Sequence, residues 1–335
     1  MWTFKPILKP TLWGGTRIAS YKKQSPAAEA GSGTPIGESL ELSALPGFMS
    51  VVADGSDAGH TLHQLVARYG ATLMGRVPYS RFGSDFPLLI KFLDAQDDLS
   101  VQVHPDDAMA RKLDMPYGKN ELWYILESRP DARLYIGMTR PVTESEYHEL
   151  VANGKFGDLL KCASVSPGEV YNIPAGTPHS LGKGCMVVEI QQTSDTTYRI
   201  YDYNRRDSHG RLRELHTELA LQAIRHDSPM QGRIRYADIP DTEVALMRSP
   251  EFCVNRLRLT RSMSRDYTQT DSFKIIILVS GCATLDDGAT SLHAVAGTVV
   301  LVAADRKRLD IAPAGGECVI LETYLEAEQL SAPNI

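Results

Sequence analysis

Residues 100–104 carry side chains that could bind a metal ion. Ser100, Gln102 and His104 alternate with Val101 and Val103, and this period of two predicts a strand with one polar and one apolar face. A hydroxyl, an amide oxygen and an imidazole on one face make chemical sense where they meet a cation. Because Gln102 and His104 are two residues apart, one strand can deliver both to the same ion. The segment therefore predicts part of a metal site.

Two further segments could complete this site. Glu121 follows His104 by 17 residues, about the spacing that lets the chain turn and run back beside the first strand. His179 follows a tight turn that contains Pro174, Gly176 and Pro178. Each residue alone would more often be an ordinary polar or hydrogen-bonded residue, but two nitrogens and two oxygens together suit a divalent ion of the zinc type. An amide ligand in place of a third imidazole favours polarisation of substrate oxygens over redox chemistry.

The composition of the chain limits its function classes. The 335 residues allow two or three domains, and the formal net charge of −6 disfavours a nucleic-acid or anionic-membrane partner. No apolar run is long enough to cross a bilayer, and the first residues lack a signal-peptide pattern. Five scattered cysteines are typical of reduced thiols. We therefore expect a cytoplasmic protein.

The first part of the chain mixes strands with helices. Strands are expected at 36–43 and 86–94, and residues 24–35 form an expected surface loop. Thr61 and Gly70 fit the ends of an amphipathic helix, and Asp106 fits the start of another that runs to Leu113. Further helical patterns cover 144–150, 157–162 and 215–224.

The later part of the chain reads as β structure. Residues 187–203 form one or two strands rich in polar groups, and strands are expected at 252–259, 273–280, 296–303 and 318–324. Pro313, Gly315 and Cys318 repeat the spacing of the turn before His179, with Cys at the His position. We expect a catalytic, metal-binding domain over 1–235 and a degenerate β-barrel without metal ligands over 236–335.

Several segments in the same order resemble one known family. The run from Gly168 through Pro174 and Gly176 to His179 matches the second metal motif of the cupin superfamily. Together with other segments it resembles type I mannose-6-phosphate isomerases, in their short bacterial form. These other segments are Leu12-Trp13-Gly14-Gly15, Phe86-Pro87-Leu88-Leu89-Ile90-Lys91, Ser100 to Pro105, Lys119 to Glu121, and Glu189 to Tyr203.

The resemblance implies a mainly β fold: two cupin-type jelly-roll barrels with a few helices in and around the N-terminal one. It implies one Zn²⁺ per chain and interconversion of mannose 6-phosphate and fructose 6-phosphate. The implied zinc ligands are Gln102, His104, Glu121 and His179.

The resemblance also implies roles for residues around the metal. Lys119 and Arg199 match functional positions of the family, and Ser100 matches a residue near the phosphate. The acidic pair before the arginine matches Glu189 and Asp195. This chain departs from larger members, which carry His-Lys-Pro-Glu where it has Gly-Lys-Asn-Glu at 118–121, and it lacks the large helical insert of eukaryotic members.

The proton-transferring residue stays open at this point. Aldose–ketose isomerisation moves a proton between C1 and C2 through a cis-enediol, so it needs a base and stabilisation of an oxyanion. Lys119 could be the base if the metal and Arg199 weaken its hold on the proton, and Asp195 or Glu189 is the rival. The expected partner is a small sugar phosphate, and the expected state is a monomer or weak homo-oligomer. Two other hypotheses are a bicupin metal-dependent oxidoreductase and a non-catalytic sugar-binding protein.

Overall fold

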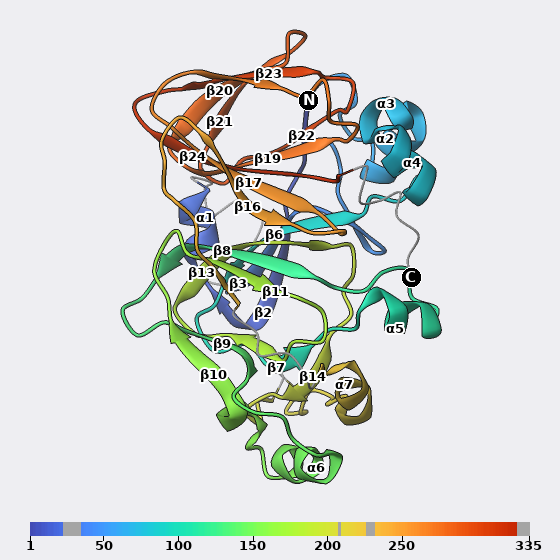
Figure 1. Ribbon diagram of the computed structural model, residues 1–335, viewed down its shortest axis with the longest axis vertical. Helices are drawn as coiled ribbons and strands as arrows, with labels where there is room; N and C mark the ends of the chain where they lie inside the picture. Colours follow the sequence, from blue (N-terminus) through green and yellow to red (C-terminus); the bar gives the residue numbers. More distant parts are fainter. Residues whose placement is uncertain (23–34, 207–208, 226–231, 327–335) are drawn as a thin grey trace.

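The computed structural model describes residues 1–22, 35–206, 209–225 and 232–326. Figure 1 shows strands from the last third of the chain stacked at one end of the molecule, above the sheets of the first two thirds. Within the described residues every sheet is built from antiparallel pairs. The predicted mainly β fold is therefore confirmed. The expected loop at 24–35 lies almost entirely outside the described residues.

A seven-stranded sheet forms the centre of the molecule. In spatial order its strands are β15 (Arg233–Ile234), β11 (Val170–Ile173), β8 (Glu121–Ser128), β13 (Cys185–Gln192), β6 (Leu88–Asp94), β3 (Ile36–Leu42) and β2 (Ile7–Gly15). Every residue of β6 and β13 is buried. Alternation sends Ile90, Phe92 and Val188 to the face that meets the C-terminal half. The other face points into the N-terminal barrel and carries Glu121 and Trp123 beside Glu189.

A five-stranded sheet closes the other side of the N-terminal barrel. Its strands, in spatial order, are β10 (Leu160–Ser164), β9 (Arg133–Met138), β12 (His179–Leu181), β7 (Val101–Val103) and β14 (Tyr198–Tyr201). Val101 and Val103 pack outward against Tyr147 and Phe156. Gln102, which alternates with them, therefore points inward, as the sequence pattern predicted.

The C-terminal half is built from two more sheets. The six-stranded sheet contains β1 (Trp2–Thr3), β22 (Val299–Val302), β19 (Lys274–Ser280), β24 (Cys318–Tyr324), β17 (Cys253–Leu259) and β16 (Glu243–Arg248). The four-stranded sheet contains β18 (Met263–Asp266), β23 (Arg308–Pro313), β20 (Cys282–Asp286) and β21 (Ser291–Val295). The strands expected from the C-terminal sequence are thus present, while the first strand of the chain joins this half through β22. The division at residue 235 stays a proposal.

Short helices surround the sheets. They are α1 (Arg17–Tyr21), α2 (Leu62–Tyr69), α3 (Ala71–Met74), α4 (Arg76–Phe82), α5 (Asp107–Lys112), α6 (Glu144–Ala152), η1 (Phe156–Leu159) and α7 (Thr217–Ala223), and a small hairpin joins β4 (Ala44–Leu45) to β5 (Phe48–Met49). Thr61 and Asp106 cap α2 and α5 through their side chains, as predicted. Within the described parts of the chain, no helix is long and apolar enough to cross a membrane.

One helical prediction is wrong. Residues 157–162 were expected to form a helix, but the chain makes the short 3₁₀ helix η1 and then enters β10, which pairs with β9. So short a helix is marginal on its own, whereas β9 offers a complete edge of hydrogen-bonding partners. Leu160 is buried and Cys162 is exposed, and a shift of register between these two residues accounts for their different burial.

The two halves share one apolar core, which makes a stability prediction possible. Phe86 and Phe273 meet across the interface with ring centroids 4.6 Å apart, and Phe273 is fully buried. We expect Phe273→Ala to lower the free energy of unfolding by about 3–5 kcal/mol, because the cavity would not close completely. Urea unfolding measures the change. Ile239→Ala, at a side chain that is 49% exposed, is the control with little expected effect, and an equal loss in both variants would contradict the prediction.

Candidate metal centre

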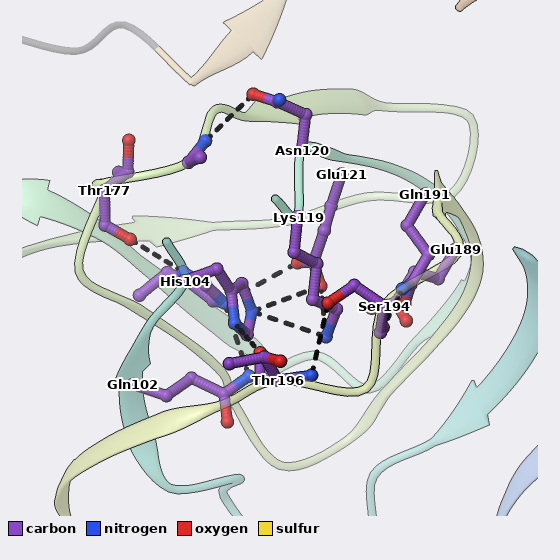
Figure 2. A network of polar contacts seen from close by, with 12 residues as sticks. Gln102, His104, Lys119, Asn120, Glu121, Thr177, Glu189, Gln191, Ser194 and Thr196 are labelled. Carbon is purple, nitrogen blue, oxygen red and sulfur yellow. Dashed lines mark hydrogen bonds and ion pairs between the residues drawn. The ribbon is translucent and has the colours of Figure 1, made fainter. Parts of the chain in front are cut away.

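Four side chains from distant parts of the sequence meet between the two sheets of the N-terminal barrel. Gln102 lies in β7, His104 directly follows it, and Glu121 and His179 are the first residues of β8 and β12. His104 Nε2 lies 3.2 Å from Glu121 Oε1, and His179 Nε2 lies 3.6 Å from Glu121 Oε2. Figure 2 shows His104 and Glu121 facing one another with Gln102 nearby. The four residues predicted as ligands therefore lie together.

Strand register places these side chains on one face. Gln102 pairs directly with His179 on one side and with Arg199 on the other. Residues directly opposite each other in antiparallel strands point to the same face. Gln102, His179 and Arg199 therefore share the inner face of the five-stranded sheet.

The turn before His179 needs its glycine. Gly176 adopts a φ of +83°, and its N–H donates to the carbonyl oxygen of His104 at 2.8 Å. A Cβ at this position would lie 2.9 Å from the carbonyl oxygen of Ala223. Only glycine accepts both this backbone conformation and this contact without strain. The turn thereby ties the His104 segment to the His179 segment.

The two imidazoles present the nitrogen that a metal would use. His104 Nδ1 lies 2.9 Å from the carbonyl oxygen of Thr196, and His179 Nδ1 lies 2.8 Å from that of Thr177. A carbonyl oxygen can only accept, so each Nδ1 must carry the proton and donate it. Each Nε2 then directs a lone pair toward Glu121. Histidine ligands of metals are oriented in this way by a carbonyl partner.

Burial sets the charge of this cluster. Burial, assisted by the Lys119 charge, lowers the pKa of His104 to about 3, and burial also lowers the pKa of His179. Burial opposes ionisation of Glu121, but the Lys119 ammonium and then His104 hold its pKa well below the usual range. The cluster therefore consists of two neutral imidazoles and one carboxylate, which are the protonation states that bind a divalent metal.

The donor atoms fit a cation better than they fit one another. His104, Glu121 and His179 each offer a ligand atom, and these atoms lie within 4.8 Å of one another. Both Glu121 oxygens are buried and make no hydrogen bond with the described residues, although Lys119 Nζ forms an ion pair with Oε1 at 2.8 Å. The Nε2 lone pairs of the two histidines face a buried carboxylate, and a positive charge between these groups would stabilise them. A metal of the zinc type meets that need.

Gln102 borders this group as a possible fourth ligand. Its amide nitrogen lies 3.4 Å from His179 Nε2, and Ser100 Oγ donates to its oxygen at 3.2 Å. A half turn of the amide would bring the oxygen to the side of His179 and leave the nitrogen beside Ser100. Ser100 thus lies behind Gln102 and can orient it.

Lys119 is held directly beside the candidate metal ligands. The residue is 4% exposed, and its Nζ lies 2.8 Å from Glu121 Oε1 and 3.5 Å from His104 Nε2. Its backbone N–H donates to the carbonyl oxygen of Pro105. The preceding residue must be small, because a Cβ on Gly118 would lie 2.5 Å from the backbone of Asp106. The loop therefore fixes Lys119 as tightly as a strand would.

Glu189 lies behind the metal ligands. Trp123 Nε1 donates to its Oε2 at 2.9 Å, and Lys91 Nζ lies 3.2 Å from its Oε1. The Trp123 ring meets the His179 ring edge-on at 5.4 Å. Burial, and then the charge of Glu121, raises the pKa of Glu189. Both oxygens of Glu189 are therefore engaged by partners away from the metal.

The remaining predicted residues lie around the ligands. Asp195 is exposed and lines a cavity of about 520 Å³ together with Thr196, Tyr117 and Phe86. Arg199 donates through Nη1 to the carbonyl oxygen of Glu214 at 2.8 Å, and it lies directly opposite Gln102 in the sheet. The structure thus brings Lys119 to the candidate ligands directly and Arg199 through register, whereas Asp195 lines a cavity whose walls do not include these ligands.

Two arginines gather around one carboxylate close to Arg199. Asp202 accepts hydrogen bonds from Arg205 and Arg213, the latter through Nε at 2.6 Å. Burial lowers the pKa of Arg199, and the Arg213 charge lowers it further. The Nε atoms of Arg199 and Arg205 are buried without a hydrogen-bond partner among the described residues. This arginine cluster (Arg199, Arg205 and Arg213) therefore has more positive charge than Asp202 can balance.

Sequence reasoning missed two contributors to the site. Gln191 lies directly opposite Glu121 in the sheet, and its spacing of two from Glu189 could have indicated that it shares the inner face. The carbonyl oxygen of Thr196, which orients His104, is a backbone atom and leaves no signal in the sequence.

Comparisons with known proteins agree on one family. Residues 1–150 match the model of the phosphomannose isomerase type I catalytic domain. The chain is 36% identical over 281 residues to mannose-6-phosphate isomerase ManA of Bacillus subtilis (strain 168), covering 83% of this chain and 85% of that protein. It is 35% identical over 271 residues to the mannose-6-phosphate isomerase of Streptococcus mutans, covering 81% and 82%. The crystal structure of mannose 6-phosphate isomerase from Bacillus subtilis superposes with a TM-score of 0.84 at 29% identity, covering 96% of this chain and 98% of that one.

Proposed function

The chain belongs to the type I phosphomannose isomerase family and is an isomerase, and from this premise we propose that it interconverts mannose 6-phosphate and fructose 6-phosphate with one Zn²⁺ per chain. The observation that carries the metal is the buried Glu121 carboxylate, faced by two neutral imidazole Nε2 atoms at 3.2 and 3.6 Å. Gln102, His104, Glu121 and His179 would hold the ion. When bound, the zinc would act as a Lewis acid on the two adjacent sugar oxygens.

Lys119 is the proposed proton carrier. The reaction removes the proton from C2 of the open-chain aldose, the electrons of that bond form the C1–C2 double bond of a cis-enediol, and the carbonyl oxygen gains a proton. Return of the proton to C1 and loss of the hydroxyl proton at C2 give the ketose. Lys119 Nζ lies 2.8 Å from Glu121 Oε1, and this closeness to the proposed metal site supports its role as the group that moves the proton.

The rival bases are less well placed for this step. Glu189 already accepts from Trp123 and pairs with Lys91, so its oxygens are occupied behind the metal ligands. Asp195 lines the open cavity instead of the ligand cluster. Asp195 is therefore better suited to contact the sugar than to move its proton.

The arginine cluster is the proposed contact for the phosphate. Arg199 shares the inner face with Gln102, and Arg205 and Arg213 add two further guanidinium groups around Asp202. Guanidinium groups bind phosphate through paired N–H donors. Ser100, which donates to Gln102, then acts on the orientation of that ligand.

Metal removal and return test this function. We expect a coupled assay to detect fructose 6-phosphate formed from mannose 6-phosphate by the purified enzyme. Chelation should remove activity, and zinc should restore it, because the buried donors need a cation to hold the two sugar oxygens. Metal content is measured at each step, so that zinc retained through chelation is recognised. Zinc-loaded protein without turnover would contradict the proposed substrate.

Oxygen consumption and binding of mannose 6-phosphate, measured on the same samples, separate the alternatives. A bicupin oxidoreductase would consume oxygen and prefer iron, whereas the amide and carboxylate donors beside two imidazoles favour zinc. A non-catalytic sugar-binding protein would bind mannose 6-phosphate without turning it over. We also propose a cytoplasmic enzyme, in agreement with its five unpaired cysteines, that acts as a monomer or weak homo-oligomer.

A further inference from the structure

Gln191 presents an unused acceptor to the interior of the barrel. Its side chain is fully buried, and its position in β13 pairs directly with Glu121 in β8. Directly opposed residues share a face and hold their Cβ atoms about 4.5–5.5 Å apart. Figure 2 shows Gln191 beside Glu189 and Ser194, on the side of the site where Lys119 and Glu121 lie. The amide is therefore a neighbour of the proposed metal centre.

Hydrogen bonds fix the direction of this amide. Gln191 Nε2 donates to the carbonyl oxygens of Gln192 and Ser194, both at 2.8 Å. Turning the amide over would set its oxygen against two acceptors, so the observed orientation is the one that the protein holds. In that orientation Oε1 is buried and has no hydrogen-bond partner among the described residues.

A buried acceptor without a partner costs folding free energy, so native proteins seldom keep one without a use. Resting on the proposed function, we propose that Gln191 Oε1 accepts a hydrogen bond from a secondary hydroxyl of the bound sugar, next to the two oxygens at the metal. Gln191 is then a specificity-determining residue, because a sugar that lacks this hydroxyl leaves the acceptor unpaired.

The same amide also has a structural duty, which the test must separate. Its two hydrogen bonds hold the start of the loop at 193–196, and the carbonyl oxygen of Thr196 accepts the Nδ1–H of His104. Any change at Gln191 can therefore disturb a metal ligand and lower turnover of every substrate. A loss of activity alone would prove nothing about a hydroxyl.

A comparison of enzyme variants with substrate analogues isolates the hydroxyl contact. The substrates are mannose 6-phosphate and its 3-deoxy and 4-deoxy analogues, and NMR follows isomerisation of each by the zinc-loaded enzyme. Wild-type enzyme should prefer mannose 6-phosphate to one analogue by roughly tenfold to a hundredfold in kcat/KM, the effect of one buried hydrogen bond. Gln191→Met should lose that preference, because it removes the acceptor while keeping the length of the side chain.

Two variants control for the structural duty. Gln192 is the neighbouring buried glutamine, but its Oε1 accepts from Asn120 and its Nε2 donates to Asp107. Gln192→Met should slow all three substrates by the same factor and leave the preference intact. Gln191→Glu keeps an oxygen toward the sugar, so it should also retain the preference, at lower activity because its second oxygen faces two carbonyl oxygens. Gln191→Leu, which also removes the acceptor, replaces Gln191→Met if that variant fails to fold.

The outcomes are distinct. Equal kcat/KM for all three substrates in wild-type enzyme, an unchanged preference in Gln191→Met, or a lost preference in Gln191→Glu would each overturn the role of Gln191. Wild-type enzyme that fails to isomerise mannose 6-phosphate itself would overturn the proposed function instead.

Discussion

Replacing Glu121 by glutamine should remove both the metal and the activity. The variant keeps the size of the side chain but loses the one negative charge among the ligands, so two neutral imidazoles and two amides remain. We expect zinc affinity to fall by at least about a hundredfold and kcat/KM by about a thousandfold or more. Zinc per chain, measured after gel filtration, and the isomerase assay check the two effects on the same sample.

Glu189→Gln is the matched control for this loss. Both glutamates are buried, and each is paired with a buried lysine: Glu121 with Lys119 at 2.8 Å and Glu189 with Lys91 at 3.2 Å. Either change removes the carboxylate from a buried ion pair. The expected cost is about 3–5 kcal/mol of stability where the ammonium is left alone, and less for Glu189→Gln because Lys91 keeps Glu38 at 3.8 Å. Only Glu121→Gln should also release the metal. A Glu121→Gln enzyme that retains one zinc per chain and its turnover would refute the assignment of this ligand.

The grouping of the candidate metal ligands was the part of the site that the sequence could predict. Alternation along 100–104 places Gln102 and His104 on one side of a strand whatever its neighbours are, and a turn with fixed glycine geometry delivers His179. These are local properties of the chain. The partners of Arg199 and Glu189 depend instead on which residues the strands place opposite each other, as in the Gln102–Arg199 pair. The register between strands that are distant in sequence cannot be predicted from the residues of either strand alone.

The wrong helix prediction and the missed contact of His104 also depend on tertiary pairing. Residues 157–162 carry a helical pattern, but a free sheet edge at β9 gives 160–164 a better set of partners. The candidate ligand His104 is oriented by the backbone carbonyl oxygen of Thr196, and every residue type possesses this atom. Local patterns therefore predicted which side chains could do chemistry, while tertiary pairing decided which atoms hold them.

Replacing Lys119 by methionine tests the proton transfer directly. The change removes the ammonium and keeps most of the apolar side chain, so the metal ligands should stay in place. We expect zinc to remain bound and kcat to fall by about a hundred- to ten-thousandfold, the range for a lost general base, with a much smaller change in KM. Exchange of the C2 proton of mannose 6-phosphate with deuterated water should slow by the same factor, because that exchange needs the base but not the complete reaction.

Lys91→Met separates this chemical role from the loss of a buried charge. Lys91 and Lys119 are both 4% exposed and both paired with a buried glutamate, so either substitution leaves a carboxylate without its ammonium and should destabilise the fold. Lys91 contacts Glu189 and Glu38, away from the ligand atoms, and its replacement should leave proton exchange near the wild-type rate once the enzyme is folded. If both variants slowed exchange equally, the loss would reflect damage to the barrel, and if neither did, Asp195 would become the base to test by Asp195→Asn. A large loss confined to Lys119→Met would leave Lys119 as the group that moves the proton.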